Sequence, residues 1–281
     1  MRTTLFLASL LAVAGCGEDG ADTTVALQFA LYDGADEIEC DDVIAGAGAD
    51  AVDLQLRDAR FYVSNVRLVT AGGAEVPMAI DQVSPFQTPD LALLDFEASC
   101  SEAGDAETNH TVVGTVPAGE YTGLRFTVGV PFELNHLDQA SMDPLPPEPL
   151  RPTGMWWNWQ GGFKFMRIDF APTPDSTSPG FNIHLGSTAC MGNPSMGEDV
   201  TSCGNPNRME VELTGFDAAT DKVAFDLRAA LDGALTNQNT GAALGCQSFP
   251  MDDECPAIFD NLGLPYAGVA PSGPQTVFGV R

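Results

Sequence analysis

Alternation of apolar and polar residues is the feature that most limits what this chain can fold into. Residues 23–34 (TTVALQFALYDG) and 52–73 (VDLQLRDARFYVSNVRLVTAGG) place apolar side chains at nearly every second position. Successive side chains of an extended strand point to opposite faces, so this period is typical of strands buried on one face. No stretch has a convincing helical period over more than a few turns. The sequence therefore predicts an all-β fold, an antiparallel β-sandwich or barrel with long loop insertions.

The connections between alternating stretches predict how the strands follow one another. Residues 52–73 are expected to form either two strands or one strand with a bulge. Short turns predict three hairpins: residues 111–116 with 121–130, 161–171 with 181–187, and 207–217 with 221–231. Residues 144–152 contain five prolines, so this segment cannot be a central strand or a helix interior. It is expected to be a fixed surface loop.

The first residues are typical of an export signal. Arg2 precedes an apolar run, and Val13-Ala14-Gly15-Cys16 is the small-residue pattern after which bacterial lipoproteins are cleaved and acylated on cysteine. We therefore expect residues 1–15 to be a lipoprotein signal peptide and residues 16–22 a tether from an outer-membrane lipid on Cys16. Residues 23–281 would form a single β domain with a disulfide-stapled C-terminal tail, exported to the periplasm or cell surface. An ordinary signal peptide with a chance cysteine is the alternative.

The remaining cysteines predict disulfides, because an exported chain folds in an oxidising compartment. There are six: Cys40, Cys100, Cys190, Cys203, Cys246 and Cys255. Six cysteines allow 15 connectivities, and the sequence does not choose among them. Short loops favour Cys190 with Cys203 and Cys246 with Cys255, which leaves Cys40 for Cys100. Zinc binding is the weaker interpretation, since there is no CxxC pair and the histidines are not spaced as partners of the cysteines.

The net charge restricts the classes of partner. The chain has 39 acidic and 12 basic residues and a formal net charge of -27. Such a charge repels nucleic acid and anionic lipid and favours cations or a basic partner protein. Solubility outside the cell explains the bulk of the charge equally well.

Aromatic and metal-ligating residues concentrate between residues 130 and 190. This stretch contains VPFELNH, GMWWNWQGGFKFMRIDF and FNIHLGSTAC, with all three tryptophans and two of the three histidines. Imidazole suits copper and thioether sulfur selects its reduced ion, so His136, His184 and nearby methionines point to copper before other metals. His110 lies outside the stretch and is also explained as a surface residue. For any one histidine alone, a satisfied or solvated side chain is the favoured interpretation, and the pair His136 and His184 beside one aromatic cluster makes a metal site equally compatible.

These segments resemble the metallo-mystery pair four-Cys family, the MbnP-type periplasmic copper proteins. The resemblance covers roughly residues 25–231, and it rests on NH, WxWQGGxKF and HLGSxxC occurring in this order. It implies that His136 and His184 are copper ligands, with a further ligand from His110, a methionine such as Met155 or Met191, or a modified residue. In that family a di-haem, MauG-like peroxidase oxidises a tryptophan of the copper protein to kynurenine. The resemblance implies the same for Trp157 or Trp159, with Trp156 as a third candidate. It also implies that Cys40, Cys100, Cys190 and Cys203 are the four family cysteines.

Three classes of function compete as interpretations of the sequence. The leading hypothesis is a non-enzymatic, lipid-anchored copper-binding protein that acts in copper acquisition or handling and is itself the substrate of the di-haem partner. The second is a carbohydrate- or small-ligand-binding β-sandwich that stacks ligands on its tryptophans. The third, a secreted hydrolase, has no GxSxG or HExxH motif and no cysteine nucleophile once the disulfides are counted. Carboxylate pairs such as Asp169 and Glu210 arise by chance among so many acidic residues.

Overall fold

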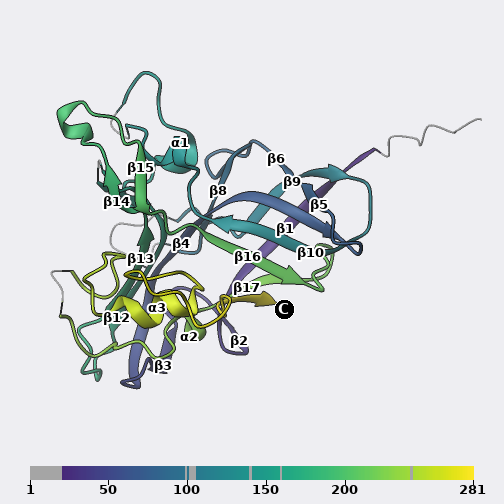
Figure 1. Ribbon diagram of the computed structural model, residues 1–281. Helices are drawn as coiled ribbons and strands as arrows, with labels where there is room; N and C mark the ends of the chain where they lie inside the picture. Colours follow the sequence, from purple (N-terminus) through teal and green to yellow (C-terminus); the bar gives the residue numbers. More distant parts are fainter. Residues whose placement is uncertain (1–20, 99, 101–105, 139–140, 159, 241–242) are drawn as a thin grey trace, which may run out of the picture.

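The computed structural model describes the chain apart from residues 1–20, 99, 101–105, 139–140, 159 and 241–242 (Figure 1). The expected signal peptide, Cys16, most of the tether and Trp159 lie outside the described residues. Among the helices described, none combines the length and the apolar character needed to span a membrane.

The described strands form two large sheets and a small ribbon (Figure 1). The first sheet has the order β18 (Phe278–Val280), β17 (Lys222–Asp226), β1 (Asp22–Asp33), β9 (Thr111–Pro117), β6 (Ala79–Ile80), with β2 (Asp36–Ile38) on β1. The second has the order β11 (Trp156–Asn158), β12 (Gly162–Pro172), β4 (Val52–Thr70), β10 (Tyr121–Val128), β16 (Met209–Thr214). β13 (Phe181–Gly186) joins β12, while β3 (Val43–Ala47), β5 (Glu75–Pro77) and β8 (Leu91–Asp95) join β4, and β7 (Gln87–Thr88) joins β8. The ribbon is β14 (Thr188–Met191) with β15 (Ser202–Asn205).

The described helices are short. They are α1 (Phe132–Asn135), α2 (Leu227–Ala230) and α3 (Cys255–Asn261), with single 3₁₀ turns η1 (Glu148–Leu150), η2 (Thr153–Met155) and η3 (Pro194–Met196). α2 begins at the cap residue Asp226, whose side chain accepts a hydrogen bond from the backbone of Ala229. The prediction of an all-β fold is confirmed.

An aromatic cluster fills the space between the two large sheets. Phe29 and Phe225 come from the first sheet, and Phe61 and Phe126 come from the second. Phe61 lies 5.5 Å from Phe225, and Phe29 lies 5.6 Å from Phe126, both edge to face. Rings prefer this arrangement because the positive edge of one meets the negative face of the other. The sheets therefore pack face to face as a β-sandwich.

β4 is one strand of 19 residues, not two. It pairs antiparallel with β12 along its first part and with β10 along its second, with register shifts in both ladders. Within it, Asn65 has a positive φ of 52°. The alternative of a single strand with a bulge is therefore the correct one.

Two of the three expected hairpins are wrong. β12 and β13 do pair antiparallel as predicted. However, β9 pairs with β1 and β6 whereas β10 pairs with β4 and β16, so the Pro-Ala-Gly turn carries the chain from one sheet to the other. Similarly, β16 pairs with β10 whereas β17 pairs with β1, in parallel, and with β18. Alternation shows which residues face the core, but it does not identify the neighbouring strand.

The two disulfides favoured by loop length, Cys190–Cys203 and Cys246–Cys255, are present, and so is the remaining pair Cys40–Cys100. The C-terminal tail packs on β13 through Cys246. The carbonyl of Cys246 accepts a hydrogen bond from the backbone N–H of His184 (2.9 Å), and the N–H of Cys246 donates one to the carbonyl of Asn182 (2.9 Å). The tail is more regular than expected, since it contains α3 and β18.

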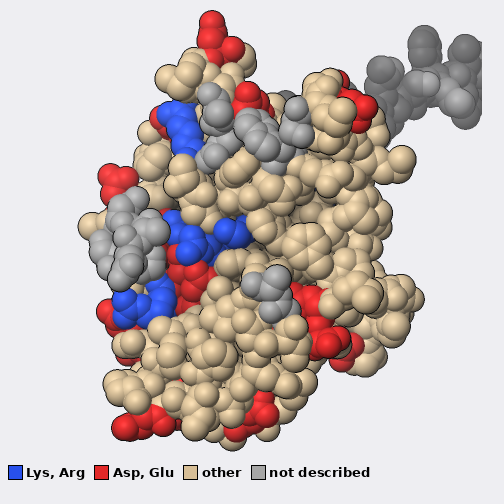
Figure 2. All heavy atoms as spheres, turned by 90° about the vertical axis from the view of Figure 1, so that its left-hand side faces the viewer, with Lys and Arg blue, Asp and Glu red and all other residues tan. Residues whose placement is uncertain are grey.

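A row of charged side chains crosses the second sheet, which we call the charge row: Asp95, Arg60, Asp58, Arg167, Asp169 and His184. In register, Arg60 faces Asp95 of β8 and Arg167 of β12, and Arg167 faces His184 of β13. Asp58 and Arg60 are almost fully buried, at 0% and 5% side-chain exposure, and form an ion pair. Figure 2 shows basic and acidic side chains gathered near the middle of one face.

Side chains of β4 and β12 hold the proline-rich loop and the turn that follows it on the sheet. The backbone carbonyl of Gly154 accepts hydrogen bonds from Lys164 Nζ (3.0 Å) and Arg167 Nη1 (3.2 Å). Tyr62 donates its hydroxyl to the carbonyl of Pro149 (2.8 Å). The expected fixed loop is therefore fixed by side chains of β4 and β12.

Replacement of Asp58 tests the charge row. Asp58→Ala leaves Arg60 buried without its main counter-ion, so the free energy of unfolding should fall by about 3–5 kcal/mol. Glu148→Ala removes a surface ion pair with Arg151 and should cost less than about 1 kcal/mol. Denaturant unfolding with the disulfides intact measures both, and equal small losses would contradict the assigned role of Asp58.

Candidate metal centre

α1 presents His136 at the edge of the second sheet. The turn follows Pro131, whose carbonyl accepts the backbone N–H of Asn135 (2.9 Å). The fully buried Asn135 side chain accepts a hydrogen bond from the backbone N–H of Phe163 (2.9 Å) and donates one to the carbonyl of Gly161 (3.0 Å). VPFELNH thus ends in a helical turn whose last residue is bonded to the start of β12.

The described residues of the WNWQGG segment form a turn that is fastened on two sides. Asn158 Oδ1 accepts the backbone N–H groups of Gln160 (3.0 Å) and Gly161 (2.7 Å). Gln160 Nε2 donates to the carbonyls of Cys190 (2.8 Å) and Gly192 (3.0 Å). At Gly162, φ is +82° and a Cβ atom would lie 2.1 Å from the carbonyl oxygen of Asn135. A glycine is therefore required where this turn meets α1.

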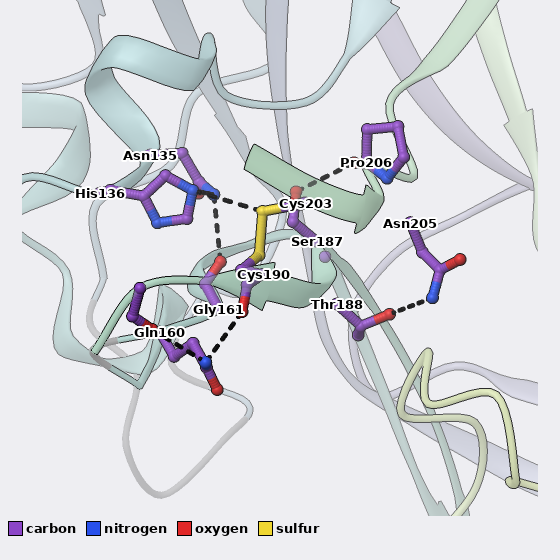
Figure 3. The surroundings of a disulfide bond; sticks show 12 residues. Asn135, His136, Gln160, Gly161, Ser187, Thr188, Cys190, Cys203, Asn205 and Pro206 are labelled. Carbon is purple, nitrogen blue, oxygen red and sulfur yellow. Dashed lines mark hydrogen bonds between the residues drawn. A yellow bond between two sulfur atoms is a disulfide. The ribbon is translucent and has the colours of Figure 1, made fainter. Parts of the chain in front are cut away.

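The His136 ring is half-buried and only weakly hydrogen-bonded. Nε2 lies 3.3 Å from Asn135 Nδ2 and 3.7 Å from Cys203 Sγ (Figure 3). Because Asn135 Nδ2 is a hydrogen-bond donor, the nearby His136 Nε2 must accept. In a neutral ring Nε2 therefore carries the lone pair and Nδ1 carries the proton. Nδ1 is buried and has no hydrogen-bond partner in the described part of the chain. An unpartnered buried donor costs about 1–3 kcal/mol.

Burial lowers the pKa of His136, and the positive charge of Arg208 lowers it further. The imidazole is therefore neutral at neutral pH, the form that binds metals. Together with the weakly used Nε2, this makes His136 a suitable ligand.

Three potential ligand atoms, from His136, Cys190 and Cys203, lie within 4.8 Å of one another. The two cysteine sulfurs are bonded to each other, so in this form the imidazole is the strongest donor of the group.

The two described tryptophans lie on opposite sides of β11. Trp156 faces Phe163 in the β11–β12 ladder and packs against the core. Trp157 packs over Gly186 and lies 5.3 Å from the ring of Phe249. It also lines a cavity of about 310 Å³ together with Gln160 and Cys190. Trp157 is half-buried and forms part of the wall of this cavity.

The other predicted ligands lie in different surroundings. His184 Nε2 is 2.6 Å from Asp169 Oδ1, and its Nδ1 is 2.8 Å from Gln247 Oε1, so both ring nitrogens already have partners. His110 stacks on Phe96 (4.4 Å) beside a separate cavity of about 290 Å³ lined by Cys40 and Cys100. Met155 is fully buried in the core. His136 alone combines a weakly bonded ring nitrogen with the WNWQGG turn.

The fastening residues were not predicted. Asn135 and Gln160 stand inside the quoted motifs, but the sequence does not show that one joins α1 to the turn and the other joins the turn to β14. Arg208 was also missed. It lies over the rings of Phe132 (6.0 Å) and Phe165 (5.9 Å) and donates Nε to the carbonyl of Val130 (2.8 Å).

The fold and the site together define a disulfide-bonded β-sandwich with a candidate metal-ligating histidine beside a tryptophan-rich turn. The family model MbnP matches residues 22–248. The solved structure of MbnP from Methylosinus trichosporium is 35% identical, with a TM-score of 0.78, over 92% of this chain and 98% of that one. No curated protein matches. The chain belongs to the MbnP family, as its motifs indicated, and the match extends past residue 231 to include Cys246.

Acid titration tests the His184 end of the charge row. Burial alone would raise the pKa of Asp169, but hydrogen bonds and charges from His184 and Arg167 outweigh it and lower the pKa to about 2. A carboxyl group whose pKa is lowered by folding stabilises the protein at every pH above its ordinary pKa of about 4. This contribution is lost as the pH falls from about 4 towards 2. Asp169→Asn should therefore lower the free energy of unfolding by about 2 kcal/mol at pH 7, with the difference from wild type shrinking below pH 4.

The comparison requires urea unfolding of both proteins between pH 2 and pH 7. Burial raises the pKa of Asp95 to about 6. The effect of Asp95 on stability therefore has the opposite pH dependence, because its contribution falls as the pH rises from about 4 to 6. Asp95 is present in both wild type and Asp169→Asn, so its contribution cancels in the difference between their free energies of unfolding. A difference that stayed constant down to pH 2 would contradict the assigned interaction.

Proposed function

We propose that this chain is an exported, lipid-anchored, non-enzymatic protein that binds copper through His136. A tryptophan of the WNWQGG segment would be oxidised to kynurenine by a di-haem partner enzyme. The observation that carries the proposal is the half-buried, neutral imidazole of His136, with a lone pair on Nε2 and an unpartnered buried Nδ1 beside that turn. Membership of the MbnP family supports a copper-associated role.

The chemistry of the site favours copper over the other metals of the compartment. Imidazole nitrogen binds copper tightly, and Cu²⁺ stands at the top of the affinity order for divalent first-row metals. Because the pKa of His136 is lowered, copper does not have to displace a proton from Nε2 near neutral pH. In copper handling the metal is cargo, so a single strong ligand completed by exchangeable ones is sufficient.

Kynurenine would supply further ligands. Oxidation breaks the C2–C3 bond of indole and adds two oxygen atoms, which two molecules of peroxide provide on reduction to water. Hydrolysis of the resulting N-formylkynurenine releases formate and leaves an aromatic amine and a ketone. Formed at the turn, these groups would lie near His136, because Asn135 bonds directly to Gly161. Trp157, on the cavity wall, is the best placed of the described candidates.

The surface charge is consistent with this role. A net charge of -27 attracts cations and favours a partner with a basic contact surface. The lipid anchor rests on the sequence around Cys16 and would keep the protein at the membrane.

Copper binding is tested by two histidine variants. Mature wild type should bind about one copper per chain, and His136→Ala should weaken binding by at least about tenfold, since a first ligand contributes more than an outer-shell group. His110→Ala is the matched control and should bind as wild type, because His110 lies at a separate cavity. Equal affinity of all three proteins would contradict the proposal.

Tryptophan oxidation is tested by peptide mass spectrometry of protein purified from its native host. One tryptophan among Trp156, Trp157 and Trp159 should carry two added oxygen atoms or be kynurenine, whereas protein expressed without the di-haem partner should be unmodified. Trp156→Phe should preserve the modification, whereas one of the two variants Trp157→Phe and Trp159→Phe should abolish it. Three intact tryptophans in the native protein would refute this part of the proposal.

A further inference from the structure

The Cys190–Cys203 disulfide differs from the other two in its surroundings. Its sulfurs and His136 are the only cluster of three potential His, Cys, Asp or Glu ligand atoms found within the described residues. Cys246 and Cys255 are buried at 1% and 0% exposure. Cys40 and Cys100 have backbone carbonyls near their sulfurs, at 3.9 Å and 3.1 Å. A histidine nitrogen thus meets a cystine sulfur at one bridge, shown in Figure 3.

The spacing of this cluster matches a shared metal ion. Metal–nitrogen bonds of about 2.0–2.1 Å and metal–sulfur bonds of about 2.3 Å, at tetrahedral to trigonal angles, separate the two ligand atoms by roughly 3.5–3.8 Å. His136 Nε2 lies 3.7 Å from Cys203 Sγ. The nitrogen therefore needs little movement to share an ion with this sulfur once the disulfide is open.

The backbone would keep both cysteines in place without the bond. Cys190 and Cys203 face each other in the β14–β15 ladder, between the pairs Thr188 with Asn205 and Met191 with Ser202. Asn205 Nδ2 also donates to Thr188 Oγ1 (3.0 Å), and Gln160 Nε2 donates to the Cys190 carbonyl (2.8 Å). Reduction would thus leave two thiols on one small ribbon, opposite each other.

The residues on the His136 side of this cluster are equally fixed and carry positive charge. Asn135 holds the backbone before His136 through Gly161 and Phe163. Arg208 has a buried Nη2 with no hydrogen-bond partner in the described residues, and its charge acts on His136. An anionic dithiolate complex would be stabilised by this cation.

We propose that Cys190–Cys203 is a redox gate, and that its reduction creates a Cu(I) site from the two cysteine thiolates and His136 Nε2. A dithiol reductant donates two electrons and two protons, so the S–S bond breaks, two thiols form and the reductant becomes a disulfide. Binding of one Cu(I) then releases the two thiol protons. Thiolate ligands select Cu(I). The inference rests on the proposed function only for the identity of the metal and for the role of His136.

The test uses the mature full-length protein, before and after anaerobic treatment with a dithiol. Cu(I) binding is measured by competition with a chromophoric chelator, and Co(II) is added separately to detect thiolate-to-cobalt charge-transfer absorption. Mass mapping of alkylated cysteines identifies the open bridge, and circular dichroism shows that the fold persists. Reduced wild type should gain one Cu(I) per chain over oxidised wild type and show the cobalt band.

Variants separate this site from general thiol binding. Cys190→Ser with Cys203→Ser should lose the added Cu(I) and the cobalt band, whereas Cys40→Ser with Cys100→Ser should retain both. His136→Ala should keep the thiols but lower the Cu(I) affinity by at least about tenfold. A bridge that stays closed in the folded protein, or Cu(I) gain that survives the Cys190 and Cys203 replacements, would overturn the inference.

Failure of this inference is distinguishable from failure of the proposed function. Native protein with bound copper and kynurenine but no gain on reduction would refute the gate alone. Gain on reduction in a protein that binds no copper while oxidised and keeps intact tryptophans would refute the proposed function alone.

Discussion

Backbone pairing along β4 is the constraint on which the rest of the molecule depends. Its 19 residues are long enough to hydrogen-bond to β12 over one part and to β10 over another. Phe61, inside this strand, packs against rings from the opposite sheet and so joins both layers through one side chain. β12 in turn supports β11, β13 and the WNWQGG turn. The position of His136 relative to the sandwich follows from this series of pairings.

Donor side chains of β4 and β12, with Arg167 of the charge row among them, explain how a proline-rich loop and the turn after it lie firmly on a sheet. Proline has no N–H to donate, so the loop offers mainly carbonyl groups. Arg167, Lys164 and Tyr62 supply donors to the carbonyls of Gly154 and Pro149. Buried cations need counter-ions, and Asp58 and Asp169 provide them. A hydrophobic surface could cover the loop, but it could not satisfy these carbonyl groups. His184 belongs to this structural row, which accounts for its engaged nitrogens.

The sequence predicts faces better than it predicts partners. Alternation correctly predicted that residues 52–73 form a strand that buries apolar side chains, because side-chain direction is a local property of a strand. The partners of β9 and β10 were wrong because a chain that changes sheets at a turn has the same alternation as one that folds back into a hairpin. The motifs located the site, since NH and WQGG meet through Asn135. The state of each histidine depends on residues distant in sequence, such as Gln247 and Arg208, and could not be read locally.

A single nitrogen atom is common to both proposed copper sites. Asn135, which is bonded to Gly161 of the WNWQGG turn, directs the lone pair of His136 to Nε2, and the same atom lies 3.7 Å from Cys203 Sγ. With the disulfide closed, the further ligands proposed beside Nε2 are the amine and the ketone of kynurenine, and such nitrogen and oxygen donors suit Cu(II). With it open, two thiolates compete for the same ion and favour Cu(I). Because Nε2 has one lone pair, the two ligand sets exclude each other. Reduction of one disulfide would therefore change the oxidation state that the site prefers, and a protein that accepts copper in one form could release it in the other.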